Sequence, residues 1–328
     1  MKKRINMYLA ISITTHCNYQ CFYCKEGGES ISKEKETIPF MMLKKIIRNA
    51  YDIGNGNFRI TGGEPTLVEY FGELVEFIMK MNDTKMRINT NGYQLFKYID
   101  ILAKYKERID IVFSVDSISA YIQDVHFQKF LSEKIINTTK ILKAKKIPVR
   151  YNIVVTSLNE GEVKKLVIKA VDELQVNVKL LDLNRFSEYL GNGSKVCGKE
   201  ADKLWKNLFV PMNKFYDFLE EISSKSDYEW TTGFIVKGHG IPMSSYFRGE
   251  NWIQVKDSTR GANFGEFCRK ECPYFKNGNC QEGVFSLFLS SNLVLHLSGC
   301  KNKMLQFNLH FMEDKQIIKA FESLLELI

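Results

Sequence analysis

The stretch THCNYQCFYCKEGG, residues 15–28, places three cysteines close together. Cys17, Cys21 and Cys24 follow a Cx3Cx2C spacing with aromatic residues between them. A closed structural zinc site needs four ligands and a disulfide needs two. Three thiols therefore indicate either a distant fourth ligand or a bound inorganic group that keeps one position open. A zinc knuckle with His16 as its fourth ligand is the alternative, although neighbours in a chain seldom share one tetrahedral metal.

Composition narrows the class of protein. The 328 residues are 45% hydrophobic and 26% charged, as in a globular enzyme of one large domain or two ordinary ones. The formal charge of +8 fits a nucleotide or an acidic peptide as partner, or a lysine-rich surface alone, and nucleic acid is not the expected partner. No apolar run approaches the roughly 20 residues of a membrane helix, so no membrane partner is expected.

The first residues and the cysteine usage indicate the compartment. The start MKKRINMYLAISI has a short apolar part with no cleavage site after it, and predicts a first strand rather than a secretory signal. The eight cysteines are too few for a disulfide scaffold, and their clustering favours metal or Fe–S ligation in a reducing cytosol. We therefore expect a cytoplasmic protein.

After the cysteine stretch, strand-like and helical segments alternate. The predicted strands are Met7–Thr14, Asn57–Thr61, Met86–Thr90, Ile109–Val115, Val149–Val155 and Val176–Leu183. The predicted helices include Phe40–Ile53, Leu67–Met81, Glu133–Ala144 and Glu160–Leu174. Alternation of this kind predicts an α/β fold, a partial (β/α)6 TIM-like barrel with a parallel sheet inside and helices outside.

The alternation breaks near Leu183, and three parts are predicted. Residues 1–184 form the barrel, and residues 185–265 form a connecting segment that lines the substrate site. Residues 266–328 form a small cysteine-rich extension that ends in a helix over Glu313–Ile328. In the connecting segment we expect one helix over Ala201–Ile222, followed by turns and short apolar runs.

A second motif, TGGEP from Thr61 to Pro65, directly follows the strand-like run NFRI. Its two glycines let a backbone approach a ligand closely, and Glu64 before Pro65 fixes a polar edge there. Alone, this motif predicts only a turn. After a Cx3Cx2C motif, and at the end of a barrel strand where active sites are built, it becomes specific.

Together, CNYQCFYC and TGGEP resemble the radical S-adenosylmethionine (SAM) superfamily over roughly Tyr8 to Asn184. The resemblance implies that Cys17, Cys21 and Cys24 are the catalytic and metal-binding residues. They would hold three irons of a [4Fe–4S] cluster, and the fourth iron would chelate SAM. One electron, from a donor such as flavodoxin or ferredoxin, would then cleave SAM to a 5′-deoxyadenosyl radical.

Three further motifs fit the same superfamily: TNG from Thr90, SVDS from Ser114 and VRYN from Val149. The resemblance implies that Tyr23, Gly63 and Ser114 contact SAM. It also implies that Glu64 hydrogen-bonds the amino group of SAM. The full set of predicted cofactor-binding residues is Tyr23, Gly62, Gly63, Glu64, Pro65, Asn91, Ser114, Asp116 and Asn152.

A second cysteine group lies in the tail, at Cys268, Cys272, Cys280 and Cys300. Four thiols predict a closed site, and their spacing alone fits structural zinc and a [4Fe–4S] cluster equally. The resemblance favours an auxiliary [4Fe–4S] cluster in a twitch- or SPASM-like extension, with the segment QEGVFSLFLSSNLVLHLSGC as a β-hairpin that places Cys300. Cys197 is interpreted as a plain thiol.

A barrel followed by a cysteine-rich tail is similar to the branch that contains GTP 3′,8-cyclase of molybdenum cofactor biosynthesis. By that resemblance Arg59, Thr90 and Arg150 bind the substrate. Three arginines of the cyclase are absent, because Ala10 and the run SLFLS over residues 286–290 stand at their positions. A triphosphate needs paired cations, so the sequence predicts a different small-molecule or peptide substrate: a peptide, a sugar or a nucleoside.

Two alternatives stay open at this point. One is GTP 3′,8-cyclase itself. The other, from a different class, is a non-catalytic Fe–S electron carrier or metal-binding scaffold, for which GGEP, TNG and SVDS would have no use. The enzyme is the preferred interpretation, in which the chain cleaves SAM reductively and abstracts a hydrogen atom from its substrate.

Overall fold

The structure, a computed structural model, describes residues 5–19, 21, 23–24, 36–117, 131–183, 198–229, 240–276, 284, 286–298, 300 and 302–327. The strands are β1 (Leu9–Ser12), β2 (Asn57–Thr61), β3 (Lys85–Thr90), β4 (Ile109–Ser114), β5 (Val149–Val155), β6 (Asn177–Asp182), β7 (Lys225–Glu229), β8 (Met243–Arg248), β9 (Asn251–Lys256), β10 (Leu287–Leu289), β11 (Val294–Leu297) and β12 (Gln306–Asn308). The helices are α1 (Phe40–Asp52), α2 (Phe71–Met79), α3 (Ile99–Lys104), α5 (Leu131–Ala144), α6 (Glu160–Ile168), α7 (Gly198–Leu208), α8 (Tyr216–Ile222), α9 (Glu266–Lys270), α10 (Pro273–Lys276) and α11 (Asp314–Leu325).

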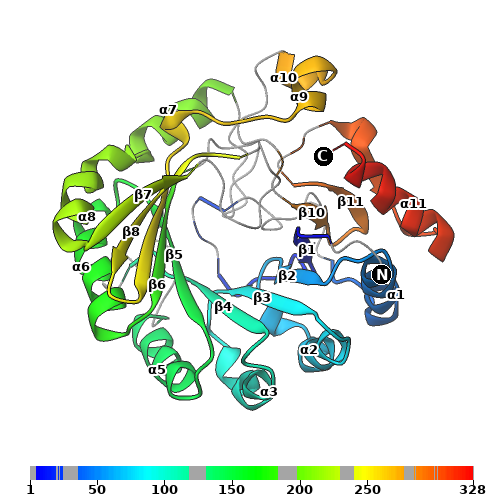
Figure 1. Cartoon of the computed structure of the whole chain (residues 1–328), viewed down its shortest axis with the longest axis horizontal. Coiled ribbons are helices and arrows are strands. Elements are labelled where there is room, and N and C mark those ends of the chain that lie inside the picture. Colours follow the sequence, from blue (N-terminus) through cyan, green and yellow to red (C-terminus); the bar gives the residue numbers. More distant parts are fainter. Residues whose placement is uncertain are drawn as a thin grey trace.

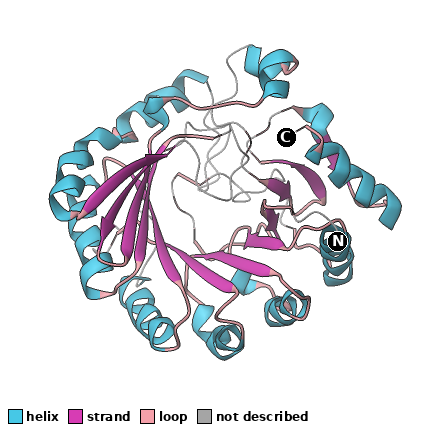
Figure 2. Cartoon of the chain, in the orientation of Figure 1, coloured by secondary structure: helices cyan, strands magenta, loops and turns pink. Residues whose placement is uncertain are grey.

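In the described ranges all these strands form one sheet, in the order β12-β11-β10-β1-β2-β3-β4-β5-β6-β9-β8-β7. Strands β1 to β6 are parallel neighbours in chain order. Figure 1 shows the sheet curving into an open barrel, and Figure 2 shows the helices on its outer side. The predicted partial barrel of six β/α units is confirmed.

Segments from the second half of the chain lengthen both edges of the barrel. Strand β9 pairs in parallel with β6 and leads into the antiparallel pairs β9-β8 and β8-β7. At the other edge β10 pairs in parallel with β1, and β10, β11 and β12 are antiparallel to one another. The predicted hairpin in the tail is therefore confirmed, whereas the expectation of only turns and short apolar runs after Ile222 is wrong.

The helix predicted over Ala201–Ile222 is in fact two helices. α7 ends at Leu208 and α8 begins at Tyr216. Pro211 lies between them, has no N–H for a helical hydrogen bond, and disfavours helical backbone at the residue before it. The apolar period continues across this break, which is why the sequence alone reads as one helix.

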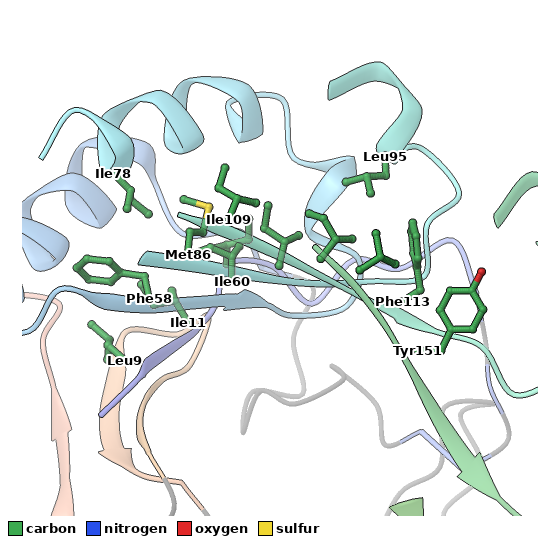
Figure 3. Packing of buried hydrophobic residues seen from close by; sticks show 14 of the residues in the cluster. Leu9, Ile11, Phe58, Ile60, Ile78, Met86, Leu95, Ile109, Phe113 and Tyr151 are labelled. Atoms are coloured by element: carbon green, nitrogen blue, oxygen red, sulfur yellow. The ribbon is translucent and has the colours of Figure 1, made fainter. Parts of the chain in front are cut away.

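The core lies between the sheet and the outer helices. Leu9, Ile11, Phe58, Ile60 and Met86 point from successive strands towards the helices in Figure 3, and all are almost fully buried. Successive side chains of a strand point to opposite faces. The residues between these apolar positions therefore point into the barrel, on what we call the inner face.

The C-terminal helix closes the outer layer beside the first one. Lys45 of α1 donates a hydrogen bond to the carbonyl oxygen of Met312 at 2.8 Å. Asn49 donates to the carboxylate of Asp314 at 2.8 Å, and Figure 1 shows α11 next to α1. None of the helices in the described ranges is long and apolar enough to cross a membrane.

Candidate active site

The first cysteine group lies on the loop that leaves β1, at the carboxyl end of the barrel strands. Cys17 is exposed, and Cys21 and Cys24 are half-buried. The backbone N–H of Tyr19 donates to the Cys17 sulfur at 3.4 Å, and the N–H of Cys24 donates to the Cys21 carbonyl oxygen at 3.0 Å. In the part of the chain that the structure describes, no three Cys, His, Asp or Glu side chains are close enough together to hold a metal ion.

The two glycines of TGGEP pack directly against this cysteine loop. The N–H of Gly63 donates to the Thr14 carbonyl oxygen and the N–H of Glu64 to the His16 carbonyl oxygen, both at 2.7 Å. A Cβ on Gly63 would lie 2.2 Å from the His16 oxygen, and a Cβ on Gly62, whose φ is +146°, would lie 2.4 Å from the Thr14 oxygen. No side chain fits at either position, so the glycines are required by the contact between the two motifs.

Glu64 is fully buried and joins the ends of β2 and β3. Its carboxylate accepts hydrogen bonds from the Thr90 hydroxyl at 2.6 Å and from the N–H of Asn91 at 2.7 Å. It also accepts from the N–H of Thr66 at 3.1 Å and from the Thr66 hydroxyl. Burial raises the pKa of Glu64 above its ordinary value, and these four hydrogen bonds oppose the rise.

Asn91 connects the same network to the cysteine loop. The N–H of Tyr93 donates to its side-chain oxygen at 3.0 Å, which fixes the orientation of the amide. The amide nitrogen then donates to Asn18 at 2.9 Å and lies 3.9 Å from the Cys17 sulfur. A donor at this position interacts with one of the predicted cluster thiolates.

Tyr23 and Asp116 tie the cysteine loop to the ends of β4 and β5. The Tyr23 hydroxyl donates to the Asp116 carboxylate, which also accepts from the N–H of Val154 at 2.9 Å. Burial, together with the negative charge of Asp116, raises the pKa of Tyr23 well above its ordinary value. The side chain of Asn159 donates to the Asp116 carbonyl oxygen at 2.8 Å and fixes the loop further.

The remaining predicted residues differ in what they contact. The Thr90 hydroxyl lies between Glu64 and the N–H of Gly92, at 3.0 Å from the latter, so it serves the network at the strand ends. Ser114 is exposed, and the side-chain oxygen of Asn152 is buried without a hydrogen-bond partner. Arg59 and Arg150 lie on the inner face of β2 and β5.

The tail cysteines occupy separate elements. Cys268 lies in α9, Cys272 follows α9 and is buried, and Cys300 follows β11 and is half-buried. Cys280 and Cys197 lie outside the described residues. The auxiliary cluster therefore stays a prediction.

Sequence analysis missed Lys179. It lies on β6 between Asn177 and Leu181, at an inward position of an alternating strand. The sequence signal is a lysine at an inward position of a strand whose alternate residues face the interior of the barrel. That signal would have identified Lys179. No hydrogen bond or ion pair from Lys179 to the described residues is present.

Comparison with known proteins agrees with this geometry. Residues 11–169 match the family model of the Radical SAM superfamily. These residues form a radical SAM domain. GTP 3′,8-cyclase of Alkaliphilus oremlandii is 28% identical over 255 residues, which are 76% of this chain and 77% of the cyclase.

Solved structures show the same fold. Streptococcus suis SuiB bound to S-adenosylmethionine has a TM-score of 0.58 at 16% identity, and the match covers 92% of this chain and 61% of SuiB. SuiB bound to the precursor peptide SuiA has a TM-score of 0.50 at 20% identity, over 67% of this chain and 48% of SuiB. This chain therefore spans less than two thirds of the length of SuiB.

The radical SAM domain confirms several predictions at the level of the family. The chain is an enzyme with a radical SAM domain over residues 11–169, and the cofactors of that domain are a [4Fe–4S] cluster and SAM. The donor set fits that cofactor, because three cysteine residues share one loop beside the TGGEP backbone and thiolates are the ligands that hold such clusters. The role of each individual site residue stays a prediction.

Proposed function

We propose that the chain cleaves SAM reductively and abstracts a hydrogen atom from a substrate other than GTP. The observation that carries this proposal is the contact between the two motifs, where the Gly63 and Glu64 N–H groups bond the carbonyl oxygens of the cysteine loop. That contact fixes the loop at the carboxyl end of the barrel, where enzymes of this architecture bind their substrates. A simple Fe–S carrier has no need of it.

Cys17, Cys21 and Cys24 would hold the cluster. The cluster would supply one electron to SAM, and the reductive cleavage of SAM would provide the means to abstract a hydrogen atom from the substrate. Tyr23 and Asp116 hold the loop in place through their hydrogen bond. Asn91 donates towards the Cys17 sulfur, and hydrogen bonds to cluster sulfurs tune the reduction potential.

For the tail we propose an auxiliary [4Fe–4S] cluster on Cys268, Cys272, Cys280 and Cys300. The number of thiols and the β10-β11 hairpin support this proposal. Strand β10 pairs with β1 of the barrel, and the chain reaches Cys300 directly after β11. Four protein ligands give a coordinatively saturated cluster. Such a cluster suits electron transfer or structural support rather than direct binding of substrate. The electron donor would be a small redox protein such as flavodoxin or ferredoxin, in a reducing cytoplasm.

Local structure argues against GTP. Ala10 is fully buried on β1 and pairs with Phe288 of β10, so a methyl group and an aromatic ring stand where the cyclase has arginines. The similarity to GTP 3′,8-cyclase over most of the chain nevertheless makes that activity the second candidate. The peptide bound by SuiB keeps a peptide among the candidate substrates, with a sugar or nucleoside.

The test is an anaerobic assay of the cluster-loaded protein with SAM and dithionite. We expect 5′-deoxyadenosine to form, to depend on Cys17, Cys21 and Cys24, and to be unaffected by GTP. The matched control is the Cys197→Ala variant, which should retain the product. No 5′-deoxyadenosine from the parent would refute the enzyme, and a cyclised nucleotide from GTP would establish the cyclase.

A further inference from the structure

The inner face of the barrel carries cations on neighbouring strands. Arg59 of β2 and Arg87 of β3 lie side by side in register, followed by Arg150 on β5 and Lys179 on β6. Lys256 on β9 continues the row, since β9 pairs with β6. Together with β4, which carries Asp110 in register with Arg87, these strands form the continuous run β2-β3-β4-β5-β6-β9, so their inward side chains face one shared space.

Neighbouring carboxylates account for only part of this charge. The Arg87 Nε lies 2.6 Å from the Asp110 carboxylate, and Asp182 acts electrostatically on Lys256. Arg150 packs over the ring of Trp252, with its guanidinium carbon 5.7 Å from the ring centroid. Its Nε is buried with no hydrogen-bond partner, and in the described chain neither Arg150 nor Lys179 forms an ion pair.

Arg150 and Lys179 are close enough to act together. Asn152 of β5 is in register with Lys179 of β6, so Arg150, two residues earlier, is the diagonal neighbour of Lys179. Diagonal neighbours have Cβ atoms about 7–8 Å apart, which two long side chains span easily. Burial, followed by the charges of Arg150, Lys256, Arg87 and Arg59, lowers the pKa of Lys179 well below its ordinary value.

Other polar atoms on the same face also lack partners. The atoms are the hydroxyl oxygen of Ser12, the side-chain oxygens of Asn89 and Asn152 and the hydroxyl oxygen of Ser286, all buried without a hydrogen bond. Native proteins leave few buried polar groups unsatisfied, and each one calls for an explanation. A polar ligand that satisfies these groups on binding provides it.

We propose that the substrate carries an anionic group, a carboxylate or a phosphate, which binds between Arg150 and Lys179 on the inner face of β5 and β6. This inference rests on the proposed function and narrows its substrate class. Arg150 would present a guanidinium edge to the two oxygens of such a group, and Lys179 a point charge. Lys179 is in register with Asn152, which is in register with Ser114, and Arg150 lies one inward position before Asn152. An anion held there would anchor a substrate next to the strand-end residues that are predicted to contact SAM.

The test titrates inorganic phosphate, and separately acetate, into the cluster-loaded full chain and follows binding by calorimetry. The variants are Lys179→Met, Lys179→Arg and Arg150→Met, and the matched control is Lys85→Met at an exposed position of β3. We expect at least one of the two anions to bind, and we expect the parent and the Lys85→Met control to bind it with the same affinity. Lys179→Met and Arg150→Met should each lose about tenfold or more, since charge-assisted hydrogen bonds are the strong ones, and Lys179→Arg should retain binding.

Each outcome decides the question. Stronger binding of phosphate than of acetate identifies a phosphorylated substrate, and the reverse identifies a carboxylate. Equal anion affinity in the parent and in Lys179→Met, or no binding of either anion, would overturn the inference. Formation of 5′-deoxyadenosine by the parent is measured separately with SAM and dithionite, so a failed anion site and a failed radical SAM activity give different results.

Discussion

The ends of the barrel strands and the inner face below them are built in opposite ways. At the strand ends, the carboxylate of Glu64 receives four hydrogen bonds from Thr66, Thr90 and Asn91. On the inner face, Arg150 and Asn152 bury polar atoms that have no partner. A network whose groups satisfy one another rigidifies a site before any ligand arrives. Buried polar groups without partners can form hydrogen bonds to a ligand when it binds. We therefore call the hydrogen-bonded network around Glu64 the frame, and the inner face below it the binding surface.

The largest expected effect comes from removing the thiols that the frame supports. Replacing Cys17, Cys21 and Cys24 with Ala should abolish SAM cleavage and lower the iron content from about eight to about four per chain, since each [4Fe–4S] cluster holds four irons. Iron and acid-labile sulfide analysis of the reconstituted protein gives the count. A parent with about four irons and one equivalent of zinc would refute the auxiliary cluster and leave the SAM-binding cluster in place.

The next effect tests the contact between the two motifs. Gly63→Ala would place a Cβ 2.2 Å from the His16 oxygen and 2.6 Å from the His16 carbonyl carbon, which are backbone atoms that cannot turn away. We expect a loss of about 1–3 kcal/mol or more in the free energy of unfolding, together with loss of SAM cleavage, because the cysteine loop must shift.

The matched control for that change is Gly161→Ala. Gly161 lies in α6 with no atom within 4 Å of an added Cβ. Alanine there should stabilise the chain by roughly 0.5–1 kcal/mol and preserve SAM cleavage. Thermal unfolding and the rate of 5′-deoxyadenosine formation are measured for both variants. A Gly63→Ala protein as stable and active as the parent would mean that the motif contact is dispensable.

A smaller effect is expected at the centre of the frame. Glu64→Gln keeps the shape but turns one acceptor oxygen into a donor, facing the N–H of Thr66 or of Asn91. The expected cost is about 1–3 kcal/mol in stability, with weaker SAM binding if Glu64 also meets the SAM amino group. The exposed Glu69→Gln is the control and should change little. Reduced stability with unchanged SAM affinity would assign Glu64 to the frame alone.

The frame was largely predictable from the sequence, and the binding surface was not. TGGEP and the cysteine spacing depend on local backbone, since Gly62 and Gly63 are needed where two loops touch. The strands β2 and β5 have the predicted bounds because their apolar residues alternate. Lys179 was missed because its meaning depends on Arg150 and Lys256, which neighbouring strands bring beside it from distant parts of the chain.

The same limit explains the errors in the second half of the chain. Strand β9 pairs with β6 from a distant part of the sequence, β8 and β7 extend the sheet beyond it, and nothing local marks these strands as barrel strands. The register between β6 and β9 is what adds Lys256 to the inner face. Long-range pairing therefore decides both the extended sheet and the charge of the surface inside it.

The smallest expected effect has the opposite sign and lies on the binding surface. Lys179→Met removes an amine that is surrounded by other cations and keeps an unbranched side chain. We expect the variant to be more stable than the parent by on the order of 1 kcal/mol at neutral pH. The pKa of Lys179 is lowered in the folded chain, so the unfolded chain binds more protons between the folded and unfolded pKa values. The stability of the parent therefore falls as pH falls through that window.

The difference between Lys179→Met and the parent should accordingly shrink as pH rises towards the unfolded lysine pKa of about 10.4, where the parent no longer loses stability to proton uptake on unfolding. Thermal unfolding at several pH values measures it, with Lys85→Met as a control that should show no such dependence. Adding the anion that binds should reverse the order, because a ligand bound only to the folded parent stabilises it by mass action. A variant less stable than the parent at neutral pH without ligand would show that Lys179 serves the fold, and the inner face would then resemble the frame above it.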